Sequence, residues 1–359
     1  MKKKIVFVIE SLQLGGAEKS LVTLLQNLDT SVCEVDLITF HKEGFFKNFV
    51  PKEVNSIYIP FPKISFFDRL RYAFKRKFIK NHHPAQLFWP IVSKYFDTYK
   101  KQYDIGIAYN QGLVTYYVAD FIKADTKFTW LNTDYKKAGY HIKFDLDFYK
   151  KYRKIISVSE EVKKGLLNEF QGMNQNFELE VIKDITERKI ITQQSEQKLV
   201  KPFEAHYINI VTVARLVKLK GLHLAIEAAK ILTDKSYPVK WHIVGEGMER
   251  SFLQKMINEY GLQNVVDLVG STDNPYPYMK SADIYVQTSL FEGLGLTVIE
   301  ASYLNKPIVS TNFSTVYGIL KDDETGLICE MHAVDVAKRI EELINNKDLK
   351  EYLSLNLSL

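Results

Sequence analysis

Short runs of β-branched and aliphatic residues alternate along the chain with longer segments whose apolar residues recur every three to four positions. Buried strands that alternate with amphipathic helices are typical of βαβ units and a parallel sheet. The pattern predicts six strands in each half of the chain. They cover 4–9, 35–40, 56–59, 104–109, 127–131, 154–158, 208–214, 239–244, 265–269, 283–287, 307–310 and 327–329.

This pattern favours an α/β fold made of two doubly wound, Rossmann-like domains that face a cleft, because 359 residues exceed what one core usually serves. We expect a first domain over 1–185, a polar linker over 186–206, a second domain over 207–345 and a tail over 346–359. Ligands of such sheets bind beyond the carboxyl ends of the strands. The interdomain cleft is therefore the expected site.

Composition excludes several classes of protein. Hydrophobic residues make up 46% and charged residues 25%, as in ordinary globular proteins. The net charge of +5 is too small to indicate a nucleic-acid partner. The two cysteines form neither a metal spacing nor a disulfide framework, which favours the cytoplasm. No apolar run is long enough to span a bilayer, so any membrane association is expected to be peripheral, at the inner face of the plasma membrane.

One stretch is strongly cationic. Residues 61–101 contain ten basic residues and two acidic ones. Within it Phe67, Leu70, Phe74 and Phe78 lie at helical spacing, which predicts an amphipathic helix. Its apolar stripe can pack on its own domain or lie on an anionic membrane surface. The local charge favours the membrane, and 64–101 is the candidate surface.

A glycine turn follows the first predicted strand. Gly15 and Gly16 stand just ahead of a helical pattern, where backbone N–H groups can face an anion. The spacing matches neither the dinucleotide fingerprint nor a P-loop, which argues against NAD and ATP. The plainer interpretation is a tight turn between strand and helix.

Two cations follow the first strand of the second half. Arg215 and Lys220 precede a helical pattern, and two cations at a helix N-terminus suit a diphosphate. The alternative is a solvated basic loop. The run Gly245-Glu246-Gly247 ends the next strand, where glycines permit close approach to a planar base.

The most informative motif spans 289–301. Glu292 lies in a loop after a strand, and Glu300 lies about one turn into the following helix. A carboxylate can accept two hydroxyl hydrogen bonds, and Gly293 and Gly295 let backbone amides approach the same ligand. The alternative is a pair of surface acids.

These motifs, in this order, resemble the family-4 retaining glycosyltransferases of the GT-B fold, most closely the bacterial capsule and exopolysaccharide enzymes. The resemblance runs from about residue 3 to residue 347. It implies transfer of a sugar from a nucleotide-diphosphate sugar, most often UDP-linked, to a glycan or lipid-linked acceptor, with retention of configuration. The residues it places around the donor are Gly15, Gly16, Arg215, Lys220, Gly245, Glu246, Glu292, Gly293, Leu294, Gly295, Leu296, Thr297 and Glu300.

The same resemblance assigns roles. Arg215 and Lys220 would hold the diphosphate, Glu292 the donor sugar and Glu300 the ribose hydroxyls. Asn132 stands where many relatives have a histidine, so Asp134 is the nearer ionisable candidate. The candidate catalytic residues are therefore Glu292, Arg215, Lys220 and Asp134, and the acceptor-side candidates are Asn132 and Asp134. Asp184 stands where the family usually has asparagine.

We expect neither a cofactor nor a metal, because two fixed cations and a helix dipole can neutralise the leaving diphosphate. Three alternatives remain. A nucleotide-sugar epimerase or a sugar phosphorylase would share the fold, and a non-catalytic sugar-nucleotide-binding subunit would fit the departure at Asn132. A dehydrogenase is disfavoured because neither half carries the dinucleotide fingerprint.

Overall fold

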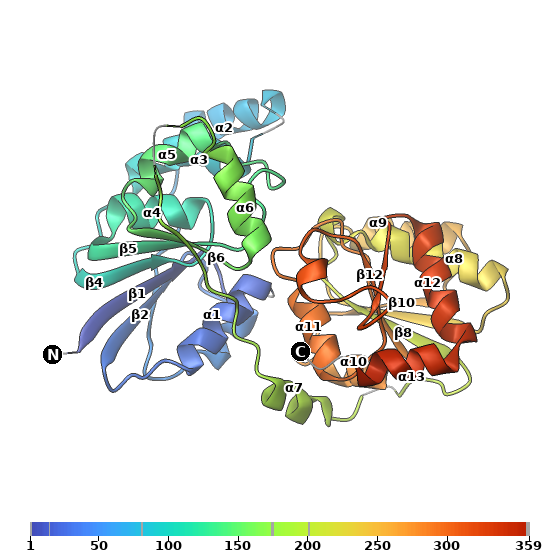
Figure 1. Cartoon of the computed structure of the whole chain (residues 1–359). Coiled ribbons are helices and arrows are strands. Elements are labelled where there is room, and N and C mark those ends of the chain that lie inside the picture. The colour runs from blue at the N-terminus through green and yellow to red at the C-terminus, as the bar shows by residue number, and fades with distance from the viewer. Residues whose placement is uncertain (1, 14, 80–81, 174–175, 200–201, 357–359) are drawn as a thin grey trace. The chain divides into compact units, whose positions relative to one another are not determined.

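The computed structural model describes residues 2–13, 15–79, 82–173, 176–199 and 202–356. Contacts divide the chain into two compact units, Met1–Ile185 and Thr186–Leu359 (Figure 1). Each unit is built on its own parallel sheet.

In the first unit the described strands form a seven-stranded parallel sheet in the order β3-β2-β1-β4-β5-β6-β7. The strands are β1 (Lys3–Ile9), β2 (Cys33–Thr39), β3 (Asn55–Tyr58), β4 (Gln102–Ala108), β5 (Lys123–Leu131), β6 (Lys154–Ser157) and β7 (Leu179–Val181). All six runs predicted for this half coincide with strands. The edge strand β7 was not among them, because its three residues, Leu179, Glu180 and Val181, are not buried and form no continuous apolar run.

The helices of the first unit follow these strands. They are α1 (Gly16–Gln26), α2 (Phe66–Phe78), α3 (Pro84–Val92), α4 (Leu113–Phe121), α5 (Ile142–Tyr149) and α6 (Glu160–Glu169). An aromatic core fills this unit: the rings of Phe40, Phe96 and Tyr117 lie 5.0–5.9 Å apart.

In the second unit the described strands form a six-stranded parallel sheet in the order β10-β9-β8-β11-β12-β13. The strands are β8 (Ile208–Val213), β9 (Val239–Val244), β10 (Val266–Gly270), β11 (Ile284–Gln287), β12 (Ile308–Thr311) and β13 (Leu327–Cys329). All six runs predicted for this half coincide with strands.

Helices cover both faces of the second sheet. They are α7 (Arg188–Ser195), α8 (Leu222–Asp234), α9 (Arg250–Glu259), α10 (Tyr276–Ser281), α11 (Leu296–Tyr303), α12 (Ala333–Asn345) and α13 (Lys347–Leu355). One buried cluster joins the strands to α8, α9 and α12, and another joins them to α10 and α11.

The segments expected as linker and tail are partly helical. Helix α7 lies within 186–206 and buries Ile191 beside α10 and α11. Helix α13 lies within 346–359 and buries Leu353 in the cluster that contains α8 and α12. Both helices therefore belong to the second unit. Their sequences looked unstructured because each buries few apolar side chains.

Both sheets have a point where the strand order reverses. In the first it lies between β1 and β4, and in the second between β8 and β11. Crossovers on the two sides of such a point run in opposite directions, which leaves an open crevice at the carboxyl ends of the strands. The topology therefore selects the loops after β1, β4, β8 and β11 as candidate sites. Among the described residues, no helix combines the length and the apolarity needed to cross a bilayer.

Candidate active site

Three loops meet at the carboxyl edge of the second sheet. The N–H of Leu216, after β8, donates to the carbonyl of Glu246, after β9, at 2.9 Å. The N–H of Leu290, after β11, donates to the carbonyl of Leu219 at 2.9 Å. The predicted donor residues of this unit, from Arg215 onward, therefore lie on one connected edge.

Two glycines make this approach possible. Gly221 has a φ of +58°, and a Cβ there would lie 2.1 Å from the carbonyl oxygen of Thr288. Gly245 has a φ of +145°, and its Cβ would lie 1.9 Å from the carbonyl oxygen of Ala214. Any side chain would separate the loops, so their contact requires glycine. Gly221 and Gly245 are therefore required at these positions by the packing of the loops, whatever ligand the loops bind.

Arg215 and Lys220 present their charges differently. The Arg215 side chain is exposed, and its guanidinium pairs with none of the described residues. Lys220 ends a short 3₁₀ turn (Lys218–Lys220), and its Nζ lies 2.6 and 2.7 Å from the two carboxylate oxygens of Glu292. Arg215 is therefore free to bind an anion. Lys220 is already paired with Glu292, the residue predicted to bind the donor sugar.

Glu292 is held in place from several sides. Besides Lys220, the Ser289 hydroxyl donates to its Oε1 at 2.6 Å and the Gln287 amide at 3.0 Å. Gln287 is itself fixed by the hydroxyl of buried Tyr285, which donates at 2.8 Å. Burial raises the pKa of Tyr285, so this hydroxyl keeps its proton. With its side chain 11% exposed, Glu292 is an oriented acceptor rather than a surface acid.

Glu300 and Glu246 lie in contrasting environments. Glu300 is buried one turn into α11, with the Tyr276 hydroxyl 3.4 Å from its Oε1. Glu246 is exposed, and its carboxylate pairs with Arg250 of α9 at 2.6 Å. The half-buried residues Gly293, Leu294, Leu296 and Thr297 and the buried Gly295 connect Glu292 to Glu300 through the start of α11.

The first unit also gathers polar side chains at its carboxyl edge. Gly15 precedes α1 and Gly16 is its first residue. Ser20, further along this helix, donates to Oδ1 of Asp184 at 2.5 Å and lies 2.9 Å from the hydroxyl of Tyr109. Burial raises the pKa of Asp184 to about 6. Ser20 and Tyr109 were not predicted, because nothing in the sequence relates them to residue 184.

Asn132 and Asp134 occupy different settings after β5. The Asn132 amide donates to the carbonyl of Tyr109 at 2.7 Å, while its buried Oδ1 accepts no hydrogen bond from the described residues. Asn110, after β4, has a similarly unpartnered buried Oδ1 among these residues. Asp134 accepts from the N–H of Lys137 at 3.0 Å and so caps a turn. The catalytic role of Asp134 stays a prediction.

The second unit is similar in sequence to a known protein family. Residues 193–356 match the family model described as glycosyl transferases group 1. The second unit belongs to the glycosyl transferases group 1 family. One relative is the poly(ribitol-phosphate) alpha-N-acetylglucosaminyltransferase of Staphylococcus aureus, 36% identical over 37% of this chain and 28% of that protein. Another is the capsular polysaccharide biosynthesis glycosyltransferase CapM of Staphylococcus aureus, 30% identical over 45% of this chain and 43% of that protein.

The chain thus spans less than half the length of these two curated relatives. The crystal structure of HepE from Anabaena, in complex with UDP and glucose, is similar over 99% of this chain and 93% of that chain, with a TM-score of 0.74 and 17% identity. This likeness confirms the predicted fold class, two Rossmann-like domains of the GT-B type.

The group 1 unit brings together most of the predicted donor residues, from Arg215 to Glu300. Gly15, Gly16, Asn132 and Asp134 belong to the other unit. Within the described residues, no group of three or more His, Cys, Asp or Glu side chains could hold a metal ion.

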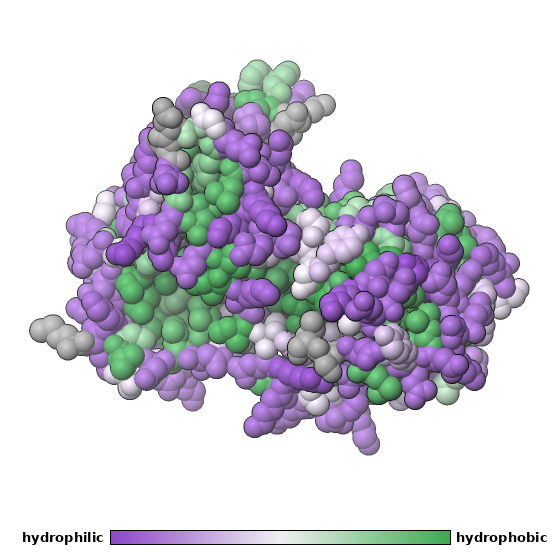
Figure 2. Space-filling model, viewed as in Figure 1, coloured by the Kyte–Doolittle hydropathy of each residue, from purple (hydrophilic) through white to green (hydrophobic). Residues whose placement is uncertain are grey.

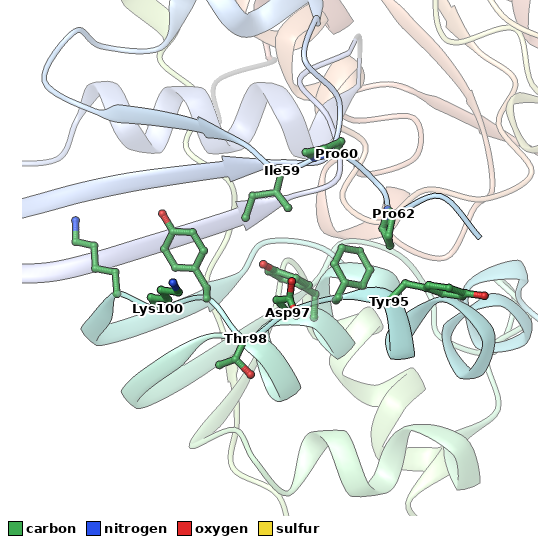
Figure 3. Close-up of a pocket in the computed structure, with 11 residues that line it drawn as sticks. Ile59, Pro60, Pro62, Tyr95, Asp97, Thr98 and Lys100 are labelled. Carbon is green, nitrogen blue, oxygen red and sulfur yellow. The ribbon is translucent and has the colours of Figure 1, made fainter. Parts of the chain in front are cut away.

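A pocket of about 670 Å³ lies elsewhere in the first unit. Figure 3 shows Ile59 and Pro62, after β3, facing Tyr95 and Asp97, ahead of β4. No predicted site residue lines this pocket. It is therefore separate from the predicted donor residues of the second unit, which lie at the carboxyl ends of the strands of the second sheet.

Proposed function

We propose that this protein transfers a sugar from a nucleoside-diphosphate sugar, with UDP as the favoured nucleotide, to a glycan or lipid-linked acceptor in bacterial surface polysaccharide synthesis. The names of the two relatives and the UDP and glucose bound by HepE support this class of substrates. A position in the cytoplasm, at the inner face of the plasma membrane, is part of the proposal because lipid-linked acceptors are presented there.

The observation that carries the proposal is the unpaired Arg215 beside the switch point of the second sheet. Its guanidinium is exposed and pairs with none of the described residues, and one residue separates Arg215 from the end of strand β8. A free guanidinium offers paired N–H donors that match two phosphate oxygens. Because Lys220 lies on the same loop, two cations can face one diphosphate.

The chemistry follows from where charge develops. Breaking the bond between the anomeric carbon and the diphosphate places negative charge on the leaving phosphate, and fixed cations stabilise that charge. Arg215 and Lys220 fill this role. Glu292, already oriented by Ser289 and Gln287, accepts hydrogen bonds from hydroxyl groups of the donor sugar. We further propose that configuration is retained, with the leaving phosphate taking the acceptor proton, and that no metal is required.

The first unit is proposed to receive the acceptor. Buried amide oxygens on Asn110 and Asn132 lack donors among the described residues. An unpartnered buried acceptor costs free energy, and a sugar hydroxyl is a donor of suitable size. The neutral amides of Asn110 and Asn132 would thus accept hydrogen bonds from a hydroxyl of the acceptor substrate, with no histidine needed at position 132.

Calorimetry with UDP, UMP and uridine tests the donor site. Arg215→Ala should weaken UDP about 10- to 150-fold, because a hydrogen bond to a charged group contributes about 1.5–3 kcal/mol. Lys218→Ala, which removes an exposed cation from the same loop, is the matched control and should change affinity less than about threefold. Equal UDP affinity in wild type and Arg215→Ala would refute the assignment.

Product analysis separates the alternatives. A transferase releases UDP and consumes donor only when an acceptor is present. An epimerase converts the donor alone, a phosphorylase needs inorganic phosphate, and a binding subunit turns over nothing. NMR of the anomeric proton in the product tests retention, and activity in excess EDTA tests metal independence.

A further inference from the structure

Helix α2 of the first unit exposes an apolar stripe. Phe66, Phe67, Leu70, Phe74 and Phe78 are each between 53% and 80% exposed. Their spacing puts them on one side of a helix with 3.6 residues per turn. Phe74 and Phe78 contact each other, with ring centroids 4.4 Å apart. Apolar side chains are visible at the surface where α2 lies at the outer end of this unit (Figures 1 and 2).

The opposite side of α2 is fastened to the domain. Asp68 is buried, and its carboxylate binds Lys94 at 2.8 Å and the Tyr95 hydroxyl at 2.6 Å. Tyr72, one turn further on, packs on Phe88 of α3 with ring centroids 4.9 Å apart. The Ser65 hydroxyl caps the first turn by accepting from the N–H of Asp68. The helix is therefore oriented by its own domain with the apolar stripe outward.

This arrangement decides between the two interpretations of the stripe. Had the stripe been core, Phe67 and Phe74 would be buried, but they are 80% and 64% exposed. The polar face carries the contacts with the domain instead. Such a contiguous apolar surface marks an interaction site.

Cations border the stripe. Arg69, Arg71 and Arg76 are exposed, and none pairs with a described residue. Lys77 is also exposed and lies 5.8 Å from the ring centroid of Phe78. With Lys75 these residues give the helix five positive charges against Asp68 alone. Two copies joined through this face would bring like charges together, so a second copy of the chain is a poor occupant.

We propose that α2 docks the first unit on an anionic lipid bilayer, with its phenylalanine side chains in the interface and its arginine side chains on the headgroups. Apolar side chains favour the acyl boundary, and each cation near an anionic surface adds about 1 kcal/mol of attraction. A nucleic acid would attract the same charges but offers no apolar phase for five exposed apolar side chains. The surface would bring the proposed acceptor unit to lipid-linked acceptors.

Vesicle co-sedimentation of the full chain tests this proposal without any nucleotide sugar, so it is independent of the donor assignment. Wild type should bind vesicles containing phosphatidylserine far better than pure phosphatidylcholine. Changing Arg69, Arg71 and Arg76 together to Gln should weaken binding about 100-fold, which is about 3 kcal/mol at about 1 kcal/mol for each charge. The double variant Phe67→Ser with Phe74→Ser should abolish sedimentation with the vesicles.

The matched control removes three charges elsewhere in the same unit. Lys123, Lys143 and Lys164 are exposed and lie outside α2, so changing them to Gln should alter vesicle binding less than about threefold. Circular dichroism and melting temperature establish that each variant is folded, as the exposed positions lead us to expect. Equal partitioning of wild type and the arginine variant would overturn the proposal. So would lipid-free dimerisation in ultracentrifugation that the phenylalanine variant abolishes.

Discussion

The pairing of Lys220 with Glu292 leads to a prediction that neither residue alone would give. Both side chains are largely buried, at 19% and 11% exposed, and Nζ contacts both carboxylate oxygens at 2.6 and 2.7 Å. If Lys220 binds the diphosphate, it must share or give up these bonds. In that case Glu292 would compete with the diphosphate for the same cation.

Glu292→Gln removes that competition. The amide keeps one oxygen that can accept from Lys220, but the charge is lost. A hydrogen bond to a charged group contributes about 1.5–3 kcal/mol, and 1.4 kcal/mol is about tenfold in affinity. We expect the variant to bind UDP as well as wild type or up to about tenfold more tightly. Turnover should fall about 10- to 150-fold, because the donor sugar loses a charged acceptor.

The two effects are measured separately, UDP binding by calorimetry and turnover by UDP release with saturating donor. Glu324→Gln is the control, since its pair with Lys321 spans 3.7 Å between side chains 75% and 64% exposed and should matter to neither measurement. A loss of UDP affinity of tenfold or more in Glu292→Gln, with an unchanged melting temperature, would refute the competition. Glu292 would then be supporting the nucleotide.

Two further predictions concern buried carboxyl groups. Glu300→Gln should weaken UDP about tenfold or more in calorimetry, because a charged acceptor for the ribose hydroxyls is lost; an unchanged affinity would contradict the ribose role. Asp184→Asn should stabilise the protein to urea above pH 7 but not near pH 4. Burial raises the Asp184 pKa from 3.8 to about 6, so wild type loses stability as the pH rises through this range, by up to about 3 kcal/mol at about 1.36 kcal/mol per unit. A pH-independent difference would contradict this prediction.

The sheets were predictable because buried parallel strands leave a continuous apolar signal. Each of the twelve predicted runs coincides with a strand. Helices α7 and α13 were missed because their amphipathicity rests on few buried residues, Ile191 and Leu353 among them. Such helices are stabilised by docking on a neighbour rather than by their own periodicity. The boundary between the units thus lies at the start of the expected linker, not within it.

The sequence singled out Lys220 and Glu292 as candidate residues, but it did not reveal the contact between them. Glu292 and Lys220 are 72 positions apart, and their bond depends on how the loops after β8 and β11 cross. The contact of Ser20 with Asp184 spans 164 positions. Motif spacing carries information about a single loop, so it reports which groups are present. Which group neutralises which is decided by packing between loops.

The two units place differently charged groups at the same topological position, the switch point of the sheet. At the switch point of the second sheet, Arg215 is exposed without a partner among the described residues and Lys220 is oriented by a carboxylate. Near that of the first, the polar groups are the unpartnered amide oxygens of Asn110 and Asn132 and a carboxyl group, Asp184, whose pKa is raised to about 6 by burial. A diphosphate would be attracted by Arg215 and Lys220 in the second unit. The three groups named for the first unit include no cation to attract it. A neutral hydroxyl could donate hydrogen bonds to the amide oxygens of the first unit, and it would need no cation. Local charge therefore supports the proposed division into a donor unit and an acceptor unit.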